Sequence, residues 1–262
     1  MIYFDVKDLT PCGTFSISIY QPIEVEVLYG WNEERKRFNT PWENKIEIKE
    51  FRKVGEATVQ VSILNTSKEV AVEDVCRVIG EIFRFYEDCR YTLGLKSGQN
   101  SLRVIIQDDY IRKRDGEIET DKVHRDPLRG KVSEEFPNFP NAQIIISVNG
   151  CKKTIDNYKH RFRERYKEYK DHKWTTEGMV FYVIAHEIAH LFSPEYLHGT
   201  VKEEILAILY GSTFAYKKDY IYVPQGDFLK TYWGALGINL SSEDVPSKRE
   251  AELRRCENEI RS

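Results

Sequence analysis

Val183-Ile184-Ala185-His186-Glu187-Ile188-Ala189-His190-Leu191-Phe192 combines three ionisable side chains with an otherwise apolar sequence. Residues four apart on an α-helix share one face, so His186 and His190 can present their imidazole nitrogens to a single zinc ion. Glu187, between them, can reach a water molecule on that ion. Without a metal, a buried helix would carry these three groups at a cost, because buried charge is unfavourable unless it is paired or metal-bound. The pattern therefore predicts one catalytic zinc ion, with His186 and His190 as ligands and Glu187 as the general base.

The length, composition and net charge of the chain are typical of a soluble globular protein. The chain has 262 residues, of which 41% are hydrophobic and 31% charged, and this length suits one large domain or a domain with a small companion. A formal net charge of −3 argues against a globally basic nucleic-acid binder. The longest apolar run, Met179 to Phe192, is interrupted by His and Glu and is too short to span a bilayer, so no membrane partner is expected.

Cysteine usage and the amino terminus both bear on the compartment. The five cysteines form an odd set without a Cys-x-x-Cys pair, which favours free thiols in a reducing interior over a disulfide framework. The residues from Met1 to Asp5 lack a basic region followed by an apolar core, so no secretory signal is expected. These observations predict a cytoplasmic protein.

Residues 1–55 are expected to form a small N-terminal antiparallel β-domain. Apolar and polar side chains alternate in the segments 15–19, 23–27 and 46–48, as in half-buried strands. The polar segment from Trp31 to Pro41 has the composition of a turn. Nothing in this region indicates chemistry, so its predicted role is structural.

Residues 56–262 are expected to form a second domain of α+β class that carries the motif. The hydrophobic periodicity predicts strands at 58–63, 102–106 and 143–148. It predicts helices from Val72 to Leu93, ended by Gly94, and at 152–173, 176–192 and 201–216, followed by a helical tail from Pro246. The charged segment from Asp108 to Pro140 is expected to be a surface excursion. Thr175 and Thr176 offer hydroxyl caps for the motif helix, and Pro194 requires it to end by then.

The segment Lys152–Lys173 is strongly basic, with nine Lys or Arg against four acidic residues and with tyrosines between them. A basic stripe with interleaved aromatic residues can follow the phosphates of a nucleic acid. A solvated helix face beside a cleft is the commoner explanation of such a charge run. Nucleic acid is therefore a less favoured partner than a peptide or protein substrate.

A catalytic zinc site needs three protein ligands and an open position for water. The candidates for the third ligand after His190 are Glu195, His198, Glu203 and Glu204. On the expected helix at 201–216, one face is formed by Val201, Ile205, Ile208, Leu209 and Ser212. Glu203 lies about 170° from the centre of that face and is expected in solvent, whereas Glu204 lies at its edge.

A stripe of small residues favours Glu204. Ala207, Gly211 and Ala215 follow Glu204 along one line of the helix, and Gly178, Ala185 and Ala189 form a matching stripe on the motif helix. Packing small residues against small residues would bring the two helices close together and the Glu204 carboxylate towards the zinc. Glu204 is the preferred third ligand, and His198 is the alternative on ligand chemistry.

The segment from Val183 to about Ala215 resembles the gluzincin metallopeptidases, which include the thermolysin and aminopeptidase groups. They carry His-Glu-x-x-His on one helix and a glutamate ligand on the next, and Glu204-Ile205-Leu206-Ala207 is similar to their Glu-x-x-Ala pattern. The resemblance implies a zincin-like domain, with a mixed sheet, the motif helix and a following helical part. It implies His186, His190 and Glu204 as zinc ligands, and a substrate cleft lined by the last strand before the motif helix.

The gap from His190 to Glu204 is shorter than in those groups, and the aminopeptidase Gly-x-Met-Glu-Asn signature is absent. His198-Gly199 is similar to the His-Gly of SprT-like proteases that act on DNA–protein crosslinks. That second resemblance would make His198 the third ligand and nucleic acid a partner.

The predicted activity is zinc-dependent peptide hydrolysis. Zinc would polarise the scissile carbonyl and lower the pKa of its water towards ~7, and Glu187 would move the proton to the leaving amine. The peptide is expected to lie along the strand at 143–148. Candidates for stabilising the oxyanion are His198, Tyr210, Tyr216, Tyr220 and Tyr222. The alternatives are a catalytically silent zincin-fold module that binds or assembles, and a regulated or toxin-like protease with one dedicated protein substrate.

Overall fold

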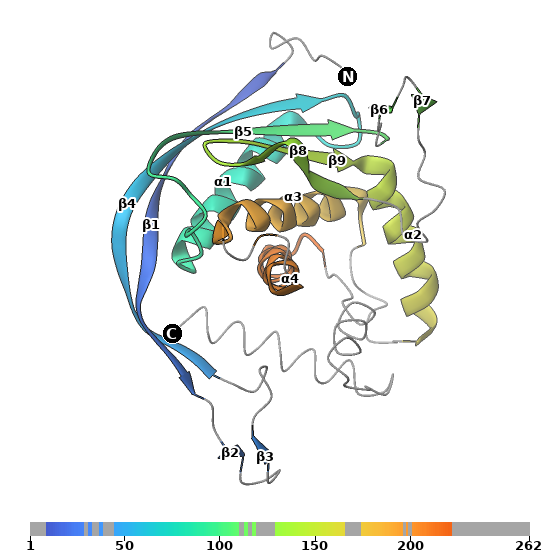
Figure 1. Ribbon diagram of the computed structural model, residues 1–262. Coiled ribbons are helices and arrows are strands. Elements are labelled where there is room, and N and C mark those ends of the chain that lie inside the picture. The colour runs from blue at the N-terminus through green and yellow to red at the C-terminus, as the bar shows by residue number, and fades with distance from the viewer. Residues whose placement is uncertain are drawn as a thin grey trace.

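The computed structural model describes residues 9–28, 31–32, 37–38, 45–109, 113–114, 117–118, 129–165, 174–195, 198 and 201–221. A mixed sheet forms one layer, and helices cover one of its faces (Figure 1). The α+β class is thus confirmed, with a mixed sheet as expected. The tail from Pro246 lies outside the described residues, as does most of the turn from Trp31 to Pro41.

The main sheet has five strands in the order β1-β4-β5-β9-β8. Their bounds are β1 Thr10–Leu28, β4 Lys45–Asn65, β5 Gly98–Gln107, β8 Gly130–Asn138 and β9 Asn141–Ser147. β4, β5 and β9 run parallel, whereas the outer strands β1 and β8 are antiparallel to their neighbours. Two short pairs, β2 Trp31–Asn32 with β3 Arg37–Phe38 and β6 Lys113–Arg114 with β7 Glu117–Ile118, lie outside this sheet.

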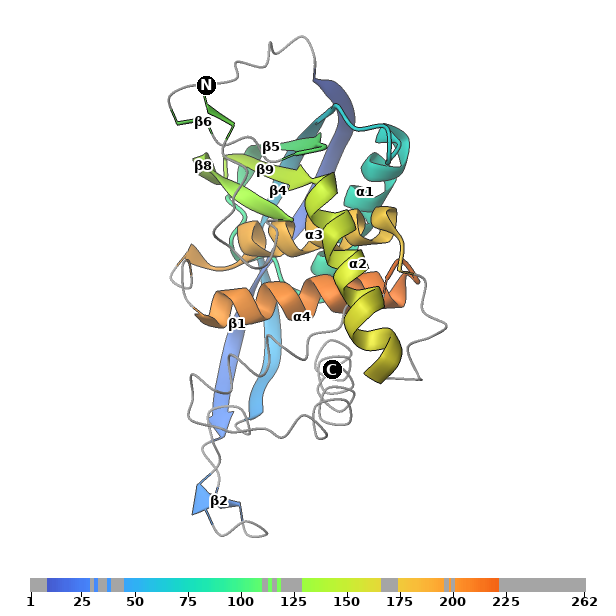
Figure 2. The same ribbon diagram turned by 90° about the vertical axis from the view of Figure 1, so that its right-hand side faces the viewer.

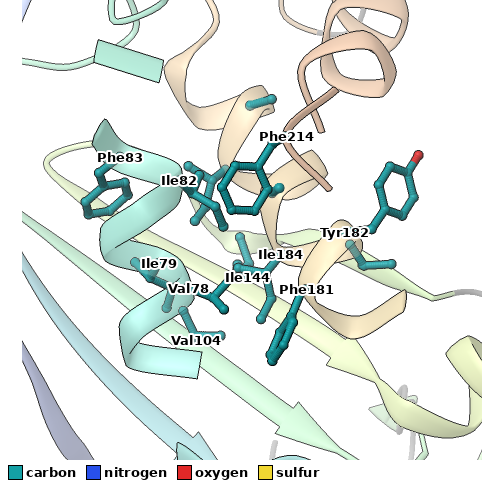
Figure 3. Packing of buried hydrophobic residues seen from close by; sticks show 14 of the residues in the cluster. Val78, Ile79, Ile82, Phe83, Val104, Ile144, Phe181, Tyr182, Ile184 and Phe214 are labelled. Atoms are coloured by element: carbon teal, nitrogen blue, oxygen red, sulfur yellow. The ribbon is translucent and has the colours of Figure 1, made fainter. Parts of the chain in front are cut away.

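The helices are α1 Val72–Asp88, α2 Val148–Arg165, α3 Thr176–Phe192 and α4 Val201–Lys217. α3 lies between the sheet and α4, so that apolar neighbours surround it (Figure 2). Alternate residues of the central strands, such as Val104 and Ile144, meet apolar residues of α1 and α3 (Figure 3). The predominantly apolar sequence of the motif helix follows from this position between two layers.

The strand predicted at 143–148 is not the edge of the sheet. β9 pairs with β5 on one side and with β8 on the other, so its backbone groups are already used and cannot bind a substrate strand. The charged segment from Asp108 to Pro140 was expected to be a surface excursion, but it contains the edge strand β8. Polar and charged residues mark an exposed edge as readily as a loop, which explains the error.

The sheet is continuous across the domain boundary expected at 55/56. β4 crosses that position without interruption, and Ile17 and Ile19 of β1 belong to the same buried cluster as Val59 and Val61. The antiparallel strands expected in the first 55 residues are confirmed. β5 pairs with β4 only from Ala57 onwards. The β1–β4 ribbon extends beyond the helices at its other end (Figure 2).

Gly94 does not end the helix that begins at Val72. α1 ends at Asp88, and Arg90 follows with a positive φ of 59°. Gly94 instead packs on the carboxyl end of α3: its N–H donates to the Phe192 carbonyl over 2.9 Å, and a Cβ there would collide with the Ser193 and Leu191 carbonyls. A close approach of two backbones, rather than a helix cap, therefore requires the glycine.

The prediction that the cysteines are free thiols is wrong for two of them. Cys12 of β1 and Cys76 of α1 form a disulfide, while Cys89 and Cys151 are free and buried. Disulfides persist mainly in oxidising compartments, so the cysteines do not support the cytoplasmic prediction. Within the described residues, no helix is both long enough and apolar enough to cross a membrane.

Candidate metal centre

The motif helix α3 begins and ends where the sequence predicts. The Thr175 hydroxyl accepts a hydrogen bond from the Gly178 N–H over 3.0 Å, which satisfies one of the free N–H groups at the helix start. The helix ends at Phe192, before Pro194. From α1, the Tyr86 hydroxyl donates to the Ala185 carbonyl over 2.5 Å, and this bond adds to the apolar contacts that fix α3.

His186 and His190 turn their rings towards one another on the same face of α3. Their Nε2 atoms are 3.2 Å apart, and the ring centres are separated by 4.8 Å. Two ligand nitrogens at tetrahedral zinc, with bonds of about 2.0–2.1 Å, lie roughly 3.3 Å apart. The shared face predicted from the four-residue spacing is confirmed, and the distance between the nitrogens fits a metal ion between them.

Glu187 follows His186 on α3 and is buried, with 6% of its surface exposed. Arg129, at the start of β8, is close enough for its charge to interact with that of Glu187. A cation near a buried carboxylate compensates for part of the solvation that the carboxylate loses on burial.

Glu203 was expected in solvent, and this prediction is wrong. Glu203 is buried, with 7% of its surface exposed. Its Oε1 atom lies 3.4 Å from Nδ1 of His190 and 3.9 Å from Nε2 of His198. The carboxylate therefore faces the side of the His190 ring that is turned away from His186.

The error came from the choice of helix face. The buried side of α4 was expected to be centred on Val201, Ile205, Ile208, Leu209 and Ser212. In the structure, the residues from Gly211 to Ala215 are all buried, as are Ala207 and Ile208. At 100° per residue, the centre of the buried side shifts by roughly 100° towards Gly211. The same shift moves Glu203 from the solvent side to the margin of the buried side.

The close approach of the two helices through small residues is confirmed. A Cβ on Gly211 of α4 would lie 3.0 Å from the backbone nitrogen of His186 and 3.1 Å from its Cα. Ala185, Ala189, Ala207 and Ala215 are fully buried. The side chain of Glu204 lies outside the described residues, so its role as third ligand stays a prediction.

The other candidates for a third ligand lie in different surroundings. The Nε2 atom of His198 is 3.3 Å from the Ser193 carbonyl, in addition to its approach to Glu203. Glu195 is exposed and pairs with Lys96 over 3.1 Å. Only His198 and Glu203 of this group therefore lie beside the histidine pair in the part of the chain that the structure describes.

The tyrosines proposed to stabilise an oxyanion lie in different surroundings. The Tyr210 ring stacks on Tyr91 with centres 3.9 Å apart. Tyr216 is exposed, and Tyr220 bonds to Glu81 and Arg77 of α1. Tyr222 lies outside the described residues.

The donor set fits a zinc site in part. Imidazole is a good zinc ligand, and His186 and His190 present two nitrogens at a suitable separation. Within the described residues, no set of three His, Cys, Asp or Glu side chains is arranged around one point. Metal-bound histidines commonly have a carboxylate at the other ring nitrogen, and Glu203 occupies this position relative to His190.

Sequence reasoning did not identify Arg129. Its Cζ lies 5.9 Å from the centre of the Tyr182 ring, and Tyr182 is one helical turn before His186. Burial lowers the pKa of Arg129, but Tyr158, Tyr182, Cys151 and Glu187 outweigh this effect and raise it. A signal that could have identified Arg129 is the strand β8 that follows it, where the sequence predicted a surface excursion.

The helix α2 presents the predicted basic segment as far as Arg165. Cys151 and Ile155 are buried against the core, whereas Lys153 and Lys159 are exposed, and Lys152 pairs with Glu69 over 2.7 Å. An amphipathic helix with a solvated outer face explains this part of the charge run. Residues 166–173 lie outside the described part.

Comparison with protein-family models, with curated proteins and with solved structures gave no match.

Proposed function

We propose that this protein is a zinc-dependent peptidase of zincin type, most similar to the gluzincins. The observation that carries the proposal is the 3.2 Å separation of the His186 and His190 Nε2 atoms on a buried helix that also holds Glu187. A zinc ion, when bound, supplies Lewis acidity for a peptide carbonyl and lowers the pKa of water towards ~7. The proposed active centre is the face that α3 turns towards α4, where Glu203 approaches His190.

Each residue of the site has a proposed task. His186 and His190 hold the metal through Nε2, and Glu204 is the proposed third ligand. Glu203 orients His190 by accepting its Nδ1–H, which also fixes the tautomer that leaves Nε2 free for the metal. Glu187 takes a proton from the attacking water and delivers it to the leaving amine.

The proposed place for the substrate is the outer edge of β8. This strand pairs with β9 on one side only within the described sheet, so its other side can add an extended peptide through main-chain hydrogen bonds. Gly130 brings β8 against the motif helix, because a Cβ at this position would meet Val183 of α3 at 2.5 Å. A peptide on this edge therefore runs beside the helix that carries Glu187.

The deciding experiment measures zinc per chain in the purified wild type and in variants. About one zinc in the wild type, lost in His190→Ala and Glu204→Ala but kept in His198→Ala, would support the proposed ligand set. If Glu204→Ala keeps its zinc and His198→Ala loses it, His198 is the third ligand, and an SprT-like enzyme is favoured. A wild type that binds no zinc even when the metal is supplied would contradict the proposal.

Peptide hydrolysis is tested separately with Glu187→Gln. This variant should keep its zinc and lose turnover on a peptide library that the wild type cleaves, because a neutral amide cannot accept the proton. Undiminished cleavage by Glu187→Gln would refute the assigned role of Glu187. A library is preferable to casein, since an enzyme with one dedicated substrate would be silent on generic protein.

A further inference from the structure

Arg129 lies immediately before the edge strand β8, beside the candidate centre. Its backbone carbonyl accepts a hydrogen bond from the Ser147 N–H over 2.8 Å, which ties it to the end of β9. Its guanidinium carbon is 5.9 Å from the centre of the Tyr182 ring. The Tyr182 ring centre is in turn 6.0 Å from that of His186. One aromatic ring therefore separates the guanidinium from the histidine pair.

Arg129 as a whole residue is half-buried, and its guanidinium is charged. The groups that interact with it electrostatically are Tyr158, Tyr182, Cys151 and Glu187, and Glu187 is the carboxylate among them. Among the described residues, no carboxylate lies within ion-pair distance of Arg129 and no side-chain hydrogen bond engages it. A guanidinium has five N–H donors in a planar fork that matches a carboxylate. Since nothing among the described residues occupies these donors, an anion from outside the chain can bind to them.

The polarity of β8 indicates which part of a peptide would reach Arg129. A peptide that adds antiparallel to β8 has its C-terminal end at Gly130, next to Arg129, because β8 begins there. A peptide in the opposite direction would bring its N-terminal end towards the guanidinium, and two cations would then repel one another. Charge complementarity therefore favours the antiparallel direction, with a carboxylate at Arg129.

We propose that Arg129 is a specificity-determining residue that binds a carboxylate of the substrate. This inference rests on the proposed peptidase function, and it assigns the substrate class: peptides that carry a carboxylate a short distance on the C-terminal side of the cleaved bond. The carboxylate belongs either to the C-terminus, which makes the enzyme a carboxypeptidase, or to an acidic side chain.

Binding can be measured without turnover in the Glu187→Gln protein. Three probes are titrated by calorimetry: N-acetyl-trialanine as the free acid, the same peptide as the C-terminal amide, and N-acetyl-Ala-Glu-Ala as the amide. Since hydrogen bonds to charged groups contribute about 1.5–3 kcal/mol, a probe with a suitably placed carboxylate should bind about 10- to 100-fold more tightly than the trialanine amide. Tighter binding of the free acid identifies the C-terminus, and tighter binding of the Glu-containing amide identifies an acidic side chain.

The chain offers a matched control for the arginine. Arg103 of β5 makes a similar cation–π contact, with Cζ 5.3 Å from the centre of the Phe136 ring on β8. Arg129→Gln should erase the preference for the carboxylate, and Arg129→Lys should keep part of it, since a lysine retains the charge but not the fork. Arg103→Gln should keep the full preference for the carboxylate. Thermal unfolding of each variant shows whether the fold is intact.

The proposal is overturned if all three probes bind equally, if none binds, or if the preference survives Arg129→Gln. Survival in that variant would mean that the carboxylate binds elsewhere, for example to a metal ion. The peptidase function fails separately, when the wild type holds no zinc and cleaves no peptide. If such a protein still prefers carboxylate probes and loses this preference in Arg129→Gln, Arg129 binds an anion although the protein is not a peptidase.

Discussion

Oε1 of Glu203 lies 3.4 Å from Nδ1 of His190 and faces the side of the ring opposite to Nε2. A carboxylate in this position orients the imidazole and makes it a better metal ligand. Glu203→Gln should therefore weaken zinc binding by about 10- to 100-fold while a site of lower affinity remains. Competition with a chelator of known zinc affinity measures the change.

Glu195→Gln is the matched control, because Glu195 is exposed and pairs only with Lys96 among the described residues. Its zinc affinity should equal that of the wild type. If Glu203→Gln binds zinc as tightly as the wild type, Glu203 does not orient His190. If it binds none at saturating zinc, Glu203 is itself a ligand.

The position of α4 against α3 depends on Gly211. A Cβ at this position would lie 3.0–3.3 Å from backbone and Cβ atoms of His186, so Gly211→Val should push the helices apart. Overpacking of this kind costs about 1–3 kcal/mol, and zinc affinity should fall as well because Glu203 and Glu204 move with α4. Urea unfolding and chelator competition measure the two effects. Tyr216→Ala, at an exposed position of the same helix, should change neither the free energy of unfolding nor the zinc affinity. A Gly211→Val protein with the stability and zinc affinity of the wild type would contradict the close packing of the two helices.

The Tyr86 hydroxyl donates to the Ala185 carbonyl within the buried core. Tyr86→Phe removes this hydrogen bond and leaves the ring contacts in place, so the free energy of unfolding should fall by about 1 kcal/mol. Chemical denaturation measures the loss, and Tyr216→Phe serves as the exposed control. An unchanged midpoint for Tyr86→Phe would mean that the bond contributes nothing to the stability of α3.

Local patterns predicted the motif helix, its Thr175 cap and the facing histidines, because spacing and capping act over a few residues. They did not predict which strand forms the edge of the sheet, since β8 and β9 are distinguished only by their partners in the folded chain. The burial of Glu203 was missed for a related reason: the buried side of α4 depends on where α3 lies, and Gly211 decides this through its lack of a side chain. The pairing of Cys12 with Cys76 requires β1 to reach α1, which no local pattern encodes.

The Cys12–Cys76 disulfide joins residues 64 positions apart and connects β1 to α1. A cross-link that closes a loop of this length restricts the unfolded chain and stabilises the folded one by about 4 kcal/mol. Cys12→Ser with Cys76→Ser should lower the free energy of unfolding by up to this amount, as measured by urea denaturation. Cys151→Ser in parallel tests the effect of losing a thiol that forms no disulfide. Five free thiols in the unreduced, unfolded wild type would show that the disulfide does not form.

Burial raises the pKa of the Cys151 thiol from 9.0 to about 12, and the thiolate is the form that reacts with alkylating agents. In the folded protein, alkylation of Cys151 by iodoacetamide at pH 9 should therefore be slower than in urea by about a thousandfold. Because the folded pKa is raised, the thiol favours the folded state below pH 9, and this contribution is lost as the pH rises towards 12. Peptide mapping by mass spectrometry follows the reaction. Equal rates in the folded and unfolded protein would show that Cys151 is not buried as described.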